Sequence, residues 1–262
     1  MTVTVLMYHG VGQPAPHGEA HYTFAEETFA DHLDRLARAG GVVPYEALLR
    51  GSAPAGAFVL TFDDGERSVV ERALPLMRAR GMVGTLFVTT GWIGAEGYVD
   101  AEQIRALDRE GWTLGTHGVT HRFLSDLDPR AIREELEGSR SALARVLGRP
   151  PLDASLPGGR VDRRVVEAAR RAGYRSLSTS LVGTNPVPPP DPLRIRRTMM
   201  IRSFGPETLQ RVVAADRLFY LKLRARQAAL GLAKRAVGNR RYELARGAAF
   251  RLLRRFRAPR SY

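Results

Sequence analysis

The sequence predicts an α/β protein built around a parallel-strand barrel, complete or distorted. Short apolar runs alternate with segments of helical periodicity along residues 1–203, which is the pattern of repeated strand–helix units. Aspartate and histidine residues follow several of the strand-like runs, at the strand ends where such folds build their sites. A chain of 262 residues suits one such domain of roughly 200 residues with an appendage.

The expected strands are short and rich in β-branched or aromatic residues, as buried strands of a parallel sheet are. The first, Val3 to Tyr8, ends at His9-Gly10, and Ala57 to Leu60 leads directly into Thr61-Phe62-Asp63-Asp64-Gly65. The remaining expected strands are Gly84 to Thr90, Trp112 to Gly115, Arg175 to Ser180 and Leu193 to Ile201.

Helical patterns fill the intervals between these strands. Two helix starts carry specific signals: Asp100 before Gln103 forms a capping box, and in Asp128-Pro129 the proline takes the first helical position. The expected helices are Glu26 to Ala39, Ser68 to Arg80, Asp100 to Glu110, Asp128 to Leu147 and Asp162 to Ala172.

The stretch Thr61-Phe62-Asp63-Asp64-Gly65 places two adjacent carboxylates at the C-terminal end of a strand. Neighbouring carboxylates repel each other, and a cation bound to one of them relieves that repulsion. One aspartate can then hold a metal while the other keeps its lone pairs for proton transfer. Asp-Asp-Gly is also ordinary turn chemistry, so the motif alone leaves a solvated turn open.

A pair of histidines four residues apart, His117 and His121, follows the strand Trp112 to Gly115. In a helix or a tight loop this spacing turns both imidazoles to one side. Two histidines and one aspartate form a common ligand set for a zinc-type ion with an open coordination position. A single histidine is more often structural, but the pair together with the upstream aspartates favours a metal site.

These two motifs resemble those of the polysaccharide deacetylase family, the NodB-homology or carbohydrate esterase family 4 group. Thr-Phe-Asp-Asp-Gly is matched in full at 61–65, and His-Ser/Thr-x-x-His is matched except that Gly118 takes the hydroxyl position. The resemblance covers most of residues 1–203 and implies a distorted (β/α)7 TIM-like barrel. It also implies that Asp63 is the general base and that Asp64, His117 and His121 are the metal ligands.

The opening Met7-Tyr8-His9-Gly10-Val11 resembles one branch of that family, in which the motifs of the barrel are circularly permuted. In that branch the histidine stands in for the general acid, so the resemblance implies this role for His9. Without the resemblance, His9 is a hydrogen-bonded residue at a strand end. The chain has no histidine after His121, which agrees with the branch.

We expect the substrate-binding residues in two further loops. Pro157, Gly158 and Arg160 resemble the third family motif, although the family's arginine usually precedes the proline. An aromatic residue at the rim of a cleft, Trp92, can stack on a sugar ring, and plain packing is an equal alternative. The family's Asp-x-x-Asp-Trp motif is absent.

The resulting hypothesis is a metal-dependent hydrolase that removes N-acetyl groups from an amino-sugar polysaccharide or a lipid-linked glycan. Zinc suits the ligand set best, and Co, Ni or Fe can fill it. Two alternatives remain open: a related amidohydrolase acting on a non-sugar amide, and a catalytically degenerate carbohydrate-binding protein. The scheme needs no organic cofactor, and the sequence carries no signal for an oligomeric state.

The net charge of +13 is concentrated in residues 217–262, which hold 14 basic residues and one acidic residue. We therefore expect a deacetylase-like barrel domain over 1–216 and a basic amphipathic helical tail over 217–262, broken near Gly238-Asn239. The tail suits an anionic membrane surface, and a helix packed on the barrel is the alternative. No aromatic–basic platform supports nucleic-acid binding.

The remaining composition bears on location. The chain has no cysteine, so disulfides are excluded and a cytoplasmic location is allowed. Met1 to His9 lacks a basic region followed by a long apolar segment, which predicts a first strand rather than a signal peptide. No apolar stretch reaches transmembrane length. We expect a cytoplasmic protein that docks on the inner membrane face through its tail.

Overall fold

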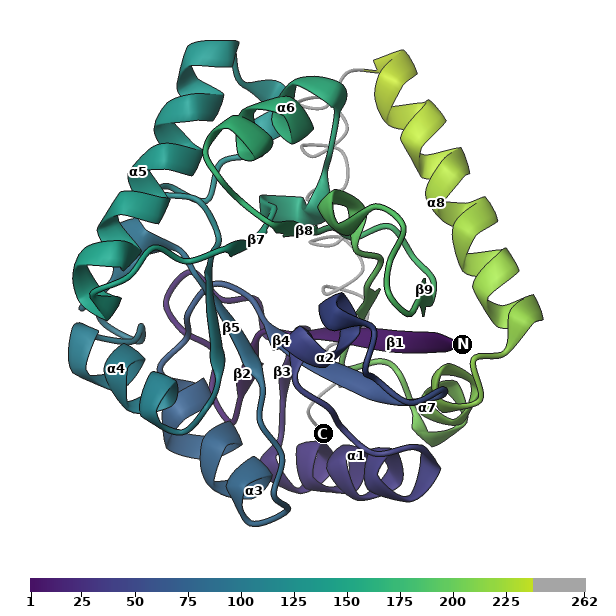
Figure 1. The fold of residues 1–262 in the computed structure, drawn as a ribbon. Coiled ribbons are helices and arrows are strands. Elements are labelled where there is room, and N and C mark those ends of the chain that lie inside the picture. The colour runs from purple at the N-terminus through teal and green to yellow at the C-terminus, as the bar shows by residue number, and fades with distance from the viewer. Residues whose placement is uncertain (238–262) are drawn as a thin grey trace, which may run out of the picture. The chain divides into compact units, whose positions relative to one another are not determined.

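A computed structural model describes residues 1–237, with side chains to residue 230. Contacts divide the chain into two compact units, the first of which is Met1–Asp216. Within it, a curled parallel sheet forms the centre and most of the helices lie outside (Figure 1). The second unit begins at Arg217 with α8 (Arg217–Val237). The expected break near Gly238-Asn239 lies outside the described residues.

The central sheet runs in the order β10-β1-β4-β5-β6-β7-β8, and each of these neighbouring pairs is parallel. A single parallel bridge between Ser178 and Ile195 joins its two ends, so the sheet curls toward a barrel as the sequence predicts. Its strands are β1 (Thr2–Tyr8), β4 (Phe58–Phe62), β5 (Thr85–Val88), β6 (Thr113–Thr116), β7 (Asp153–Ser155), β8 (Ser176–Ser178) and β10 (Thr198–Met199).

Three short strands lie outside this parallel order. β9 (Asn185–Pro186) pairs antiparallel with β1. β2 (Gly10–Val11) and β3 (Thr23–Phe24) pair with each other and close the loop that follows β1. The expected last strand, Leu193 to Ile201, is only partly formed: residues Pro192–Arg194 make a 3₁₀ turn, and only Thr198–Met199 forms a regular strand.

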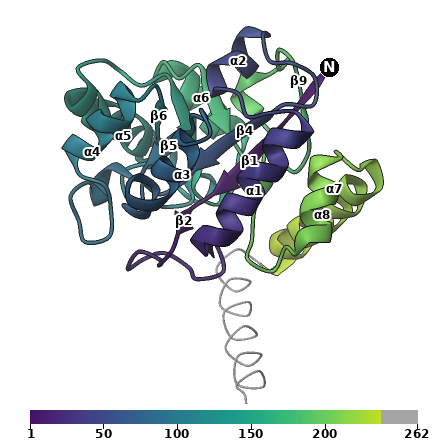
Figure 2. The ribbon, with the colours of Figure 1, turned by 90° about the horizontal axis from the view of Figure 1, so that it is seen from below.

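Helices connect the strands, as parallel neighbours require. α1 packs along β1 (Figure 2), where Phe29 and His32 contact the ring of Tyr8. The helices of the first unit are α1 (Glu26–Ala39), α2 (Tyr45–Arg50), α3 (Leu74–Arg78), α4 (Ala101–Arg109), α5 (Pro129–Leu147), α6 (Arg163–Arg171) and α7 (Pro206–Val213). The predicted helix starts at Asp100 and Asp128 are confirmed.

The expected helix Ser68 to Arg80 is interrupted. A π-helical turn spans Val69–Ala73, and α3 follows it. Pro75 has no N–H to donate to the carbonyl four residues earlier. The N–H of the preceding residue, Leu74, donates to the carbonyl of Val69, five residues earlier, as in a π-helix. The missing donor therefore accounts for the wider turn at this point.

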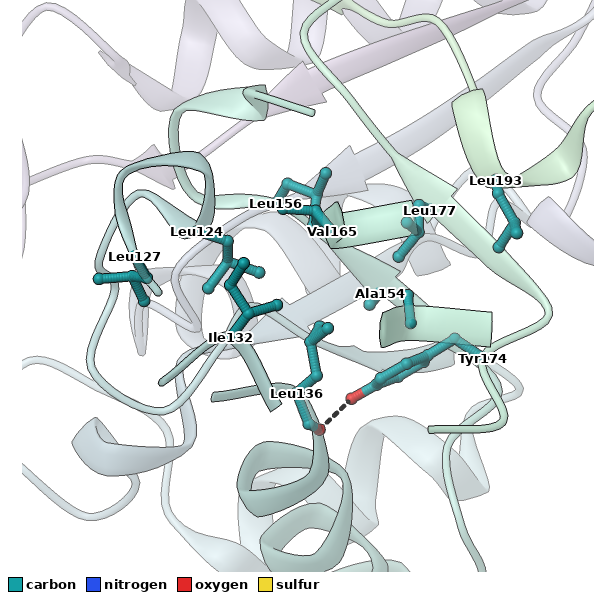
Figure 3. Packing of buried hydrophobic residues seen from close by; sticks show 11 residues of the cluster. Leu124, Leu127, Ile132, Leu136, Ala154, Leu156, Val165, Tyr174, Leu177 and Leu193 are labelled. Atoms are coloured by element: carbon teal, nitrogen blue, oxygen red, sulfur yellow. Dashed lines mark hydrogen bonds between the residues drawn. The ribbon is translucent and has the colours of Figure 1, made fainter. Parts of the chain in front are cut away.

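Two clusters of the barrel core bear on the position of the site. α2 covers the end where the strands begin, because Tyr45 and Leu48 pack among interior residues such as Val59 and Phe87. A second cluster fills the space between α5, α6 and strands β7 and β8 (Figure 3). It consists of Leu124, Leu127, Ile132, Leu136, Ala154, Leu156, Val165, Ala169, Tyr174, Leu177 and Leu193. With one end of the strands covered by α2, the opposite end carries the site.

Candidate active site

Asp63 and Asp64 lie at the C-terminal end of β4, as the sequence predicts. The backbone N–H of Asp63 donates to Tyr8 at the end of β1, and that of Thr89, after β5, donates to the carbonyl of Asp64. Asp64 has a positive φ of 73° and Gly65 one of 87°. A non-glycine residue in the left-handed region is strained, and such strain is concentrated at functional sites.

The side chain of Asp63 is completely engaged. Arg197 donates from Nη1 to Oδ1 at 2.7 Å and from Nη2 to Oδ2 at 2.8 Å, and Ser155 Oγ donates to Oδ2 at 3.1 Å. Burial opposes ionisation of Asp63, but the charge of Arg197 and its hydrogen bonds outweigh that penalty, so the pKa of Asp63 lies below its usual value. Asp63 is therefore a buried carboxylate that stays charged.

Sequence reasoning did not identify Arg197, which is completely buried. Its Nε donates to the carbonyl of Thr179 at 2.9 Å and its Nη2 to Ser155 Oγ at 2.6 Å. A signal for it does exist. Residues two apart share a face of an extended segment, and Ile195, two residues earlier, is completely buried. Alternation from Ile195 would have placed Arg197 inside.

Arg160, in contrast, contacts the loop that follows the two histidines. Its Nη1 lies 3.3 Å from Asp126 Oδ2, and its guanidinium carbon lies 4.0 Å from the ring centre of Phe123. The arginine that pairs with the first aspartate of the motif is Arg197. Pairing with Asp63 therefore falls to a segment of the chain other than this loop.

His117 and His121 lie in the loop that follows β6. Nδ1 of His117 is 3.1 Å from the carbonyl oxygen of Ser155. Because a carbonyl only accepts, Nδ1 carries the proton and Nε2 keeps its lone pair. Burial lowers the pKa of His117 to about 4, so the ring is neutral near pH 7. The Nε2 atoms of His117 and His121 lie 3.4 and 3.1 Å from Asp64 Oδ1.

Asp64, His117 and His121 form the one group among the described residues whose ligand atoms could hold a metal ion, all within 4.8 Å of one another. Oδ1 of Asp64 is buried and has no hydrogen-bond partner, although both Nε2 atoms approach it. A buried carboxylate oxygen without a donor is costly, whereas lone pairs that converge in this way suit a cation. The three residues therefore fit the metal that the ligand pattern implies.

His9 follows β1 and lies outside the three-residue group. Its ring stacks on Tyr22 with 4.6 Å between ring centres, and its Nδ1 is buried without a hydrogen-bond partner. Tyr8 and Phe62 are register partners of the neighbouring parallel strands β1 and β4, so His9 and Asp63 follow adjacent strand ends. His9 thus presents an unsatisfied nitrogen beside the aspartate pair.

Trp92 packs against the site from the loop after β5. Its ring centre lies 5.1 Å from that of His121, 4.8 Å from that of Tyr98 and 5.3 Å from that of His17. Its side chain is half-buried. The contact with His121 makes Trp92 a neighbour of the metal group.

Pro157 and Gly158 follow β7 and contact the His117–His121 loop and its continuation. A Cβ on Gly118 would lie 3.7 Å from Pro157, and a Cβ on Gly158 would lie 2.6 Å from Phe123. Gly158 also has a positive φ of 63°. These two residues therefore fit tightly against the loop that carries the histidines.

Comparison with known proteins agrees with this geometry. A family model described as polysaccharide deacetylase matches residues 50–177. The protein YxkH of Bacillus subtilis (strain 168) is 26% identical over 189 residues, which are 68% of this chain and 64% of YxkH. A chitin deacetylase of Pestalotiopsis sp is 24% identical over 140 residues, covering 53% of this chain and 46% of that protein. The chain thus spans about half to two thirds of these relatives.

Solved structures give the same fold. The deacetylase PplD of Streptococcus pyogenes, solved in complex with acetate, superposes with a TM-score of 0.72 at 22% identity. The match covers 81% of this chain and 98% of that one. The barrel inferred from the alternating strands and helices is therefore confirmed. The permuted branch suggested by Met7-Tyr8-His9 stays a prediction.

Proposed function

Because the chain belongs to the polysaccharide deacetylase family, we propose that it hydrolyses the N-acetyl group of an amino sugar in a glycan. One observation carries the proposal: a buried aspartate bound by a buried arginine, Asp63 and Arg197, stands beside the group Asp64, His117 and His121. A base and a ligand set in adjacent positions suit hydrolysis by an activated water.

Asp64, His117 and His121 would hold a divalent ion, for which zinc is the first choice, and the ion would supply a polarised acetyl carbonyl and a water of lowered pKa. The rest of the chemistry falls to side chains of this chain. Asp63 accepts the proton of the attacking water as general base. Arg197 holds both of its oxygens and keeps it ionised.

The leaving amine needs a proton, and His9 is the residue proposed to deliver it. The support is its buried, unpartnered Nδ1 and its position at the strand end adjacent to that of Asp63. Tyr22 stacks on its ring and fixes the plane in which it can donate. His9 would therefore act as the general acid while Asp63 acts as the base.

The proposal is tested by acetate release from a panel of N-acetylated glycans, with zinc or cobalt added to metal-stripped protein. We expect release from at least one glycan and none after chelation. Hydrolysis only of small cyclic imides or peptide amides, followed as ring opening or as release of a free amine, would favour the non-sugar amidohydrolase. Glycan binding without any release in metal-replete buffer would favour the degenerate carbohydrate-binding protein.

The role of His9 has its own test. His9→Ala should lower turnover by about 100-fold and remove the alkaline limb of the pH–rate profile, because that limb reports a protonated acid. Metal content should be unchanged. If His9→Ala loses the metal, His9 is a ligand and the assignment as acid is wrong.

We also propose that the basic helix α8 docks on an anionic membrane surface. Leu218 and Leu221 are 68% and 62% exposed, and in a helix they share a face with Ala225, Ala228 and Ala229. Basic side chains flank this face on both sides, the pattern of a helix that lies in a membrane interface. No described helix is long and apolar enough to cross a membrane. The flanking basic residues are Lys222 and Arg226, and Arg217 and Arg224.

Vesicle co-sedimentation of the full-length protein tests this docking. The protein should sediment with vesicles that contain phosphatidylserine, and replacing the four flanking basic residues by glutamine should abolish it. Each of them contributes about 1 kcal/mol near an anionic surface. Equal recovery of the parent and the glutamine variant would discard the proposal.

A further inference from the structure

The loop from His117 to His121 has to hold two imidazoles without regular secondary structure. It contains two residues with positive φ, Gly118 at 77° and His121 at 61°. The carbonyls of Gly118 and Val119 accept hydrogen bonds from the N–H groups of Thr90 and Gly91. This fixes one side of the loop. The N–H groups on its other side need acceptors of their own.

Glu135, on α5, supplies those acceptors. Its Oε2 accepts from the backbone N–H of Val119 at 2.7 Å and of Thr120 at 3.0 Å. Its Oε1 accepts a short hydrogen bond from the hydroxyl of Thr120. The residue is only 6% exposed. A buried carboxylate that accepts from three donors is stabilised by them, so the loop and Glu135 depend on each other.

The fit requires glycine at position 118. A Cβ built on Gly118 would lie 3.0 Å from Glu135 Oε2, a distance that real Cβ contacts rarely show. The carboxylate thus occupies the space that a side chain at position 118 would need. The family motif His-Ser/Thr-x-x-His has a hydroxyl residue at the position of Gly118. In this chain the hydroxyl group lies two residues later, on Thr120, and donates to Glu135.

The helical turn that carries Glu135 is itself anchored to the strand before the histidines. Leu136 is buried, and its carbonyl accepts from Tyr174 Oη at 3.0 Å (Figure 3). The same Oη lies 2.7 Å from the hydroxyl of Thr116, the last residue of β6. Tyr174 therefore ties α5 to the start of the loop, and the position of Glu135 is set by the core.

From these contacts we propose that Glu135 is a positioning residue that presents His121 to the metal through the backbone of Val119 and Thr120. The proposal rests on the metal group of the proposed function and adds a residue outside its motifs. Glu135 touches neither the ion nor the substrate in this account. It holds the peptide groups next to His121 in the one conformation that turns the Nε2 atom toward Asp64.

The test compares metal binding by full-length Glu135→Ala, Glu135→Gln and the parent. Zinc affinity is measured by competition with a chromophoric chelator, and the visible spectrum of the cobalt-loaded protein reports ligand geometry. Glu135→Ala should weaken zinc binding by about 10- to 100-fold, as loss of a residue that orients a ligand does, and should reduce the cobalt band. Glu135→Gln keeps an oxygen for the two N–H groups and should stay within about fivefold of the parent.

Glu134→Ala is the matched control. Glu134 is the preceding residue of the same helix, its side chain is 62% exposed and it pairs with Arg130, so its loss should leave affinity and spectrum unchanged. If Glu135→Ala does not fold, Thr120→Val decides, because it removes only the hydroxyl contact and should weaken zinc binding measurably.

Two failures are distinguishable. Parental affinity and spectrum in Glu135→Ala, or in Thr120→Val where that variant decides, would overturn the inference and leave the metal site standing. A parent protein that binds neither zinc nor cobalt would instead overturn the proposed function from which the inference starts.

Discussion

Two buried aspartates at opposite ends of the barrel, Asp153 and Asp64, differ in how completely their carboxylates are hydrogen-bonded. At the end where strands begin, Asp153 accepts hydrogen bonds from Arg175 Nη2 at 2.7 Å and from Ser176 Oγ at 2.7 Å. Arg175 also pairs with Glu46 of α2. At the end where strands finish, Asp64 leaves Oδ1 without a donor. Asp153 is therefore satisfied within the chain, whereas Asp64 keeps one oxygen without a hydrogen-bond donor.

This difference between Asp153 and Asp64 indicates that the first carboxylate stabilises the fold and that the second is available to bind a ligand. A buried carboxylate that is fully hydrogen-bonded helps to fix the fold, and its loss exposes unsatisfied partners. A buried carboxylate that lacks a partner destabilises the fold unless something else binds it. Asp63 stands between the two cases, because Arg197 and Ser155 satisfy it and yet it lies beside the metal group. The arginine contacts at the two ends can therefore be disturbed separately.

The largest expected effect is on turnover, from Arg197→Lys. Lysine keeps the charge but cannot bind both oxygens of Asp63 as guanidinium does. Turnover should fall by about 100-fold, the contribution typical of a positioned base. The weaker pairing should raise the pKa of Asp63. Since the base acts ionised, the acid limb of the pH–rate profile should move to higher pH.

Arg175→Lys is the matched control for Arg197→Lys at the other end of the barrel. It disturbs the same kind of arginine–aspartate pair, but far along the strands from the metal group, and should leave turnover within about twofold. A loss of turnover that is equal in both variants would mean that the two ends are not functionally distinct.

A smaller effect, on stability, is expected from Asp153→Asn. It removes the negative partner of Arg175, whose side chain is 35% exposed, so water takes over part of the lost interaction. The free energy of unfolding in urea should fall by about 2 kcal/mol, while kcat of the folded enzyme stays at the parental value. An unchanged unfolding midpoint would show that this ion pair does not stabilise the barrel.

Local sequence patterns predicted the strand ends and the residues that follow them, because each of these patterns involves only a few neighbouring positions. The apolar run before Asp63 predicts a buried strand, and Asp128-Pro129 predicts a helix start. Contacts between distant segments were not accessible in this way. Arg197 and Asp63 are 134 positions apart, and a charged residue in a partly irregular segment predicts exposure rather than burial.

The contacts of Glu135 could not be predicted from the sequence either, although they join positions only 15 and 16 residues apart. Its spacing from Ile132 places it on the buried face of α5, unlike Glu134 and Glu137, but helical periodicity does not say which donors a buried carboxylate meets there. Only the path of the His117–His121 loop over α5 makes it an acceptor for two backbone N–H groups. The glycine at position 118 was visible in the sequence, but its cause is a contact with another element.

The smallest expected effect is a pH dependence of stability from His32, a buried residue bonded to Tyr8 Oη at 3.1 Å. Burial lowers the pKa of His32 to about 4 from 6.5. The unfolded chain therefore takes up a proton below about pH 6.5 that the folded protein takes up only near pH 4, so stability falls as pH falls through this window. His32→Gln should reduce the loss of unfolding free energy between pH 7 and pH 5 by about 1 kcal/mol.

Urea unfolding of metal-free parent and variant at both pH values checks this contribution. The two proteins differ only at position 32, so the difference between their pH dependences isolates the contribution of His32. An equal loss of unfolding free energy in the two proteins would show that protonation of His32 does not contribute to the pH dependence of stability.

The most direct test of the central claim is the metal content of Asp63→Asn and Asp64→Asn, measured on protein dialysed against zinc. Asparagine tolerates the positive φ of Asp64, so both variants keep the backbone. We expect about one ion per chain in the parent and in Asp63→Asn, which should have lost turnover by 100-fold or more. Asp64→Asn should bind far less. Equal metal in Asp64→Asn and the parent, or parental turnover in Asp63→Asn, would contradict the division of roles between the two aspartates.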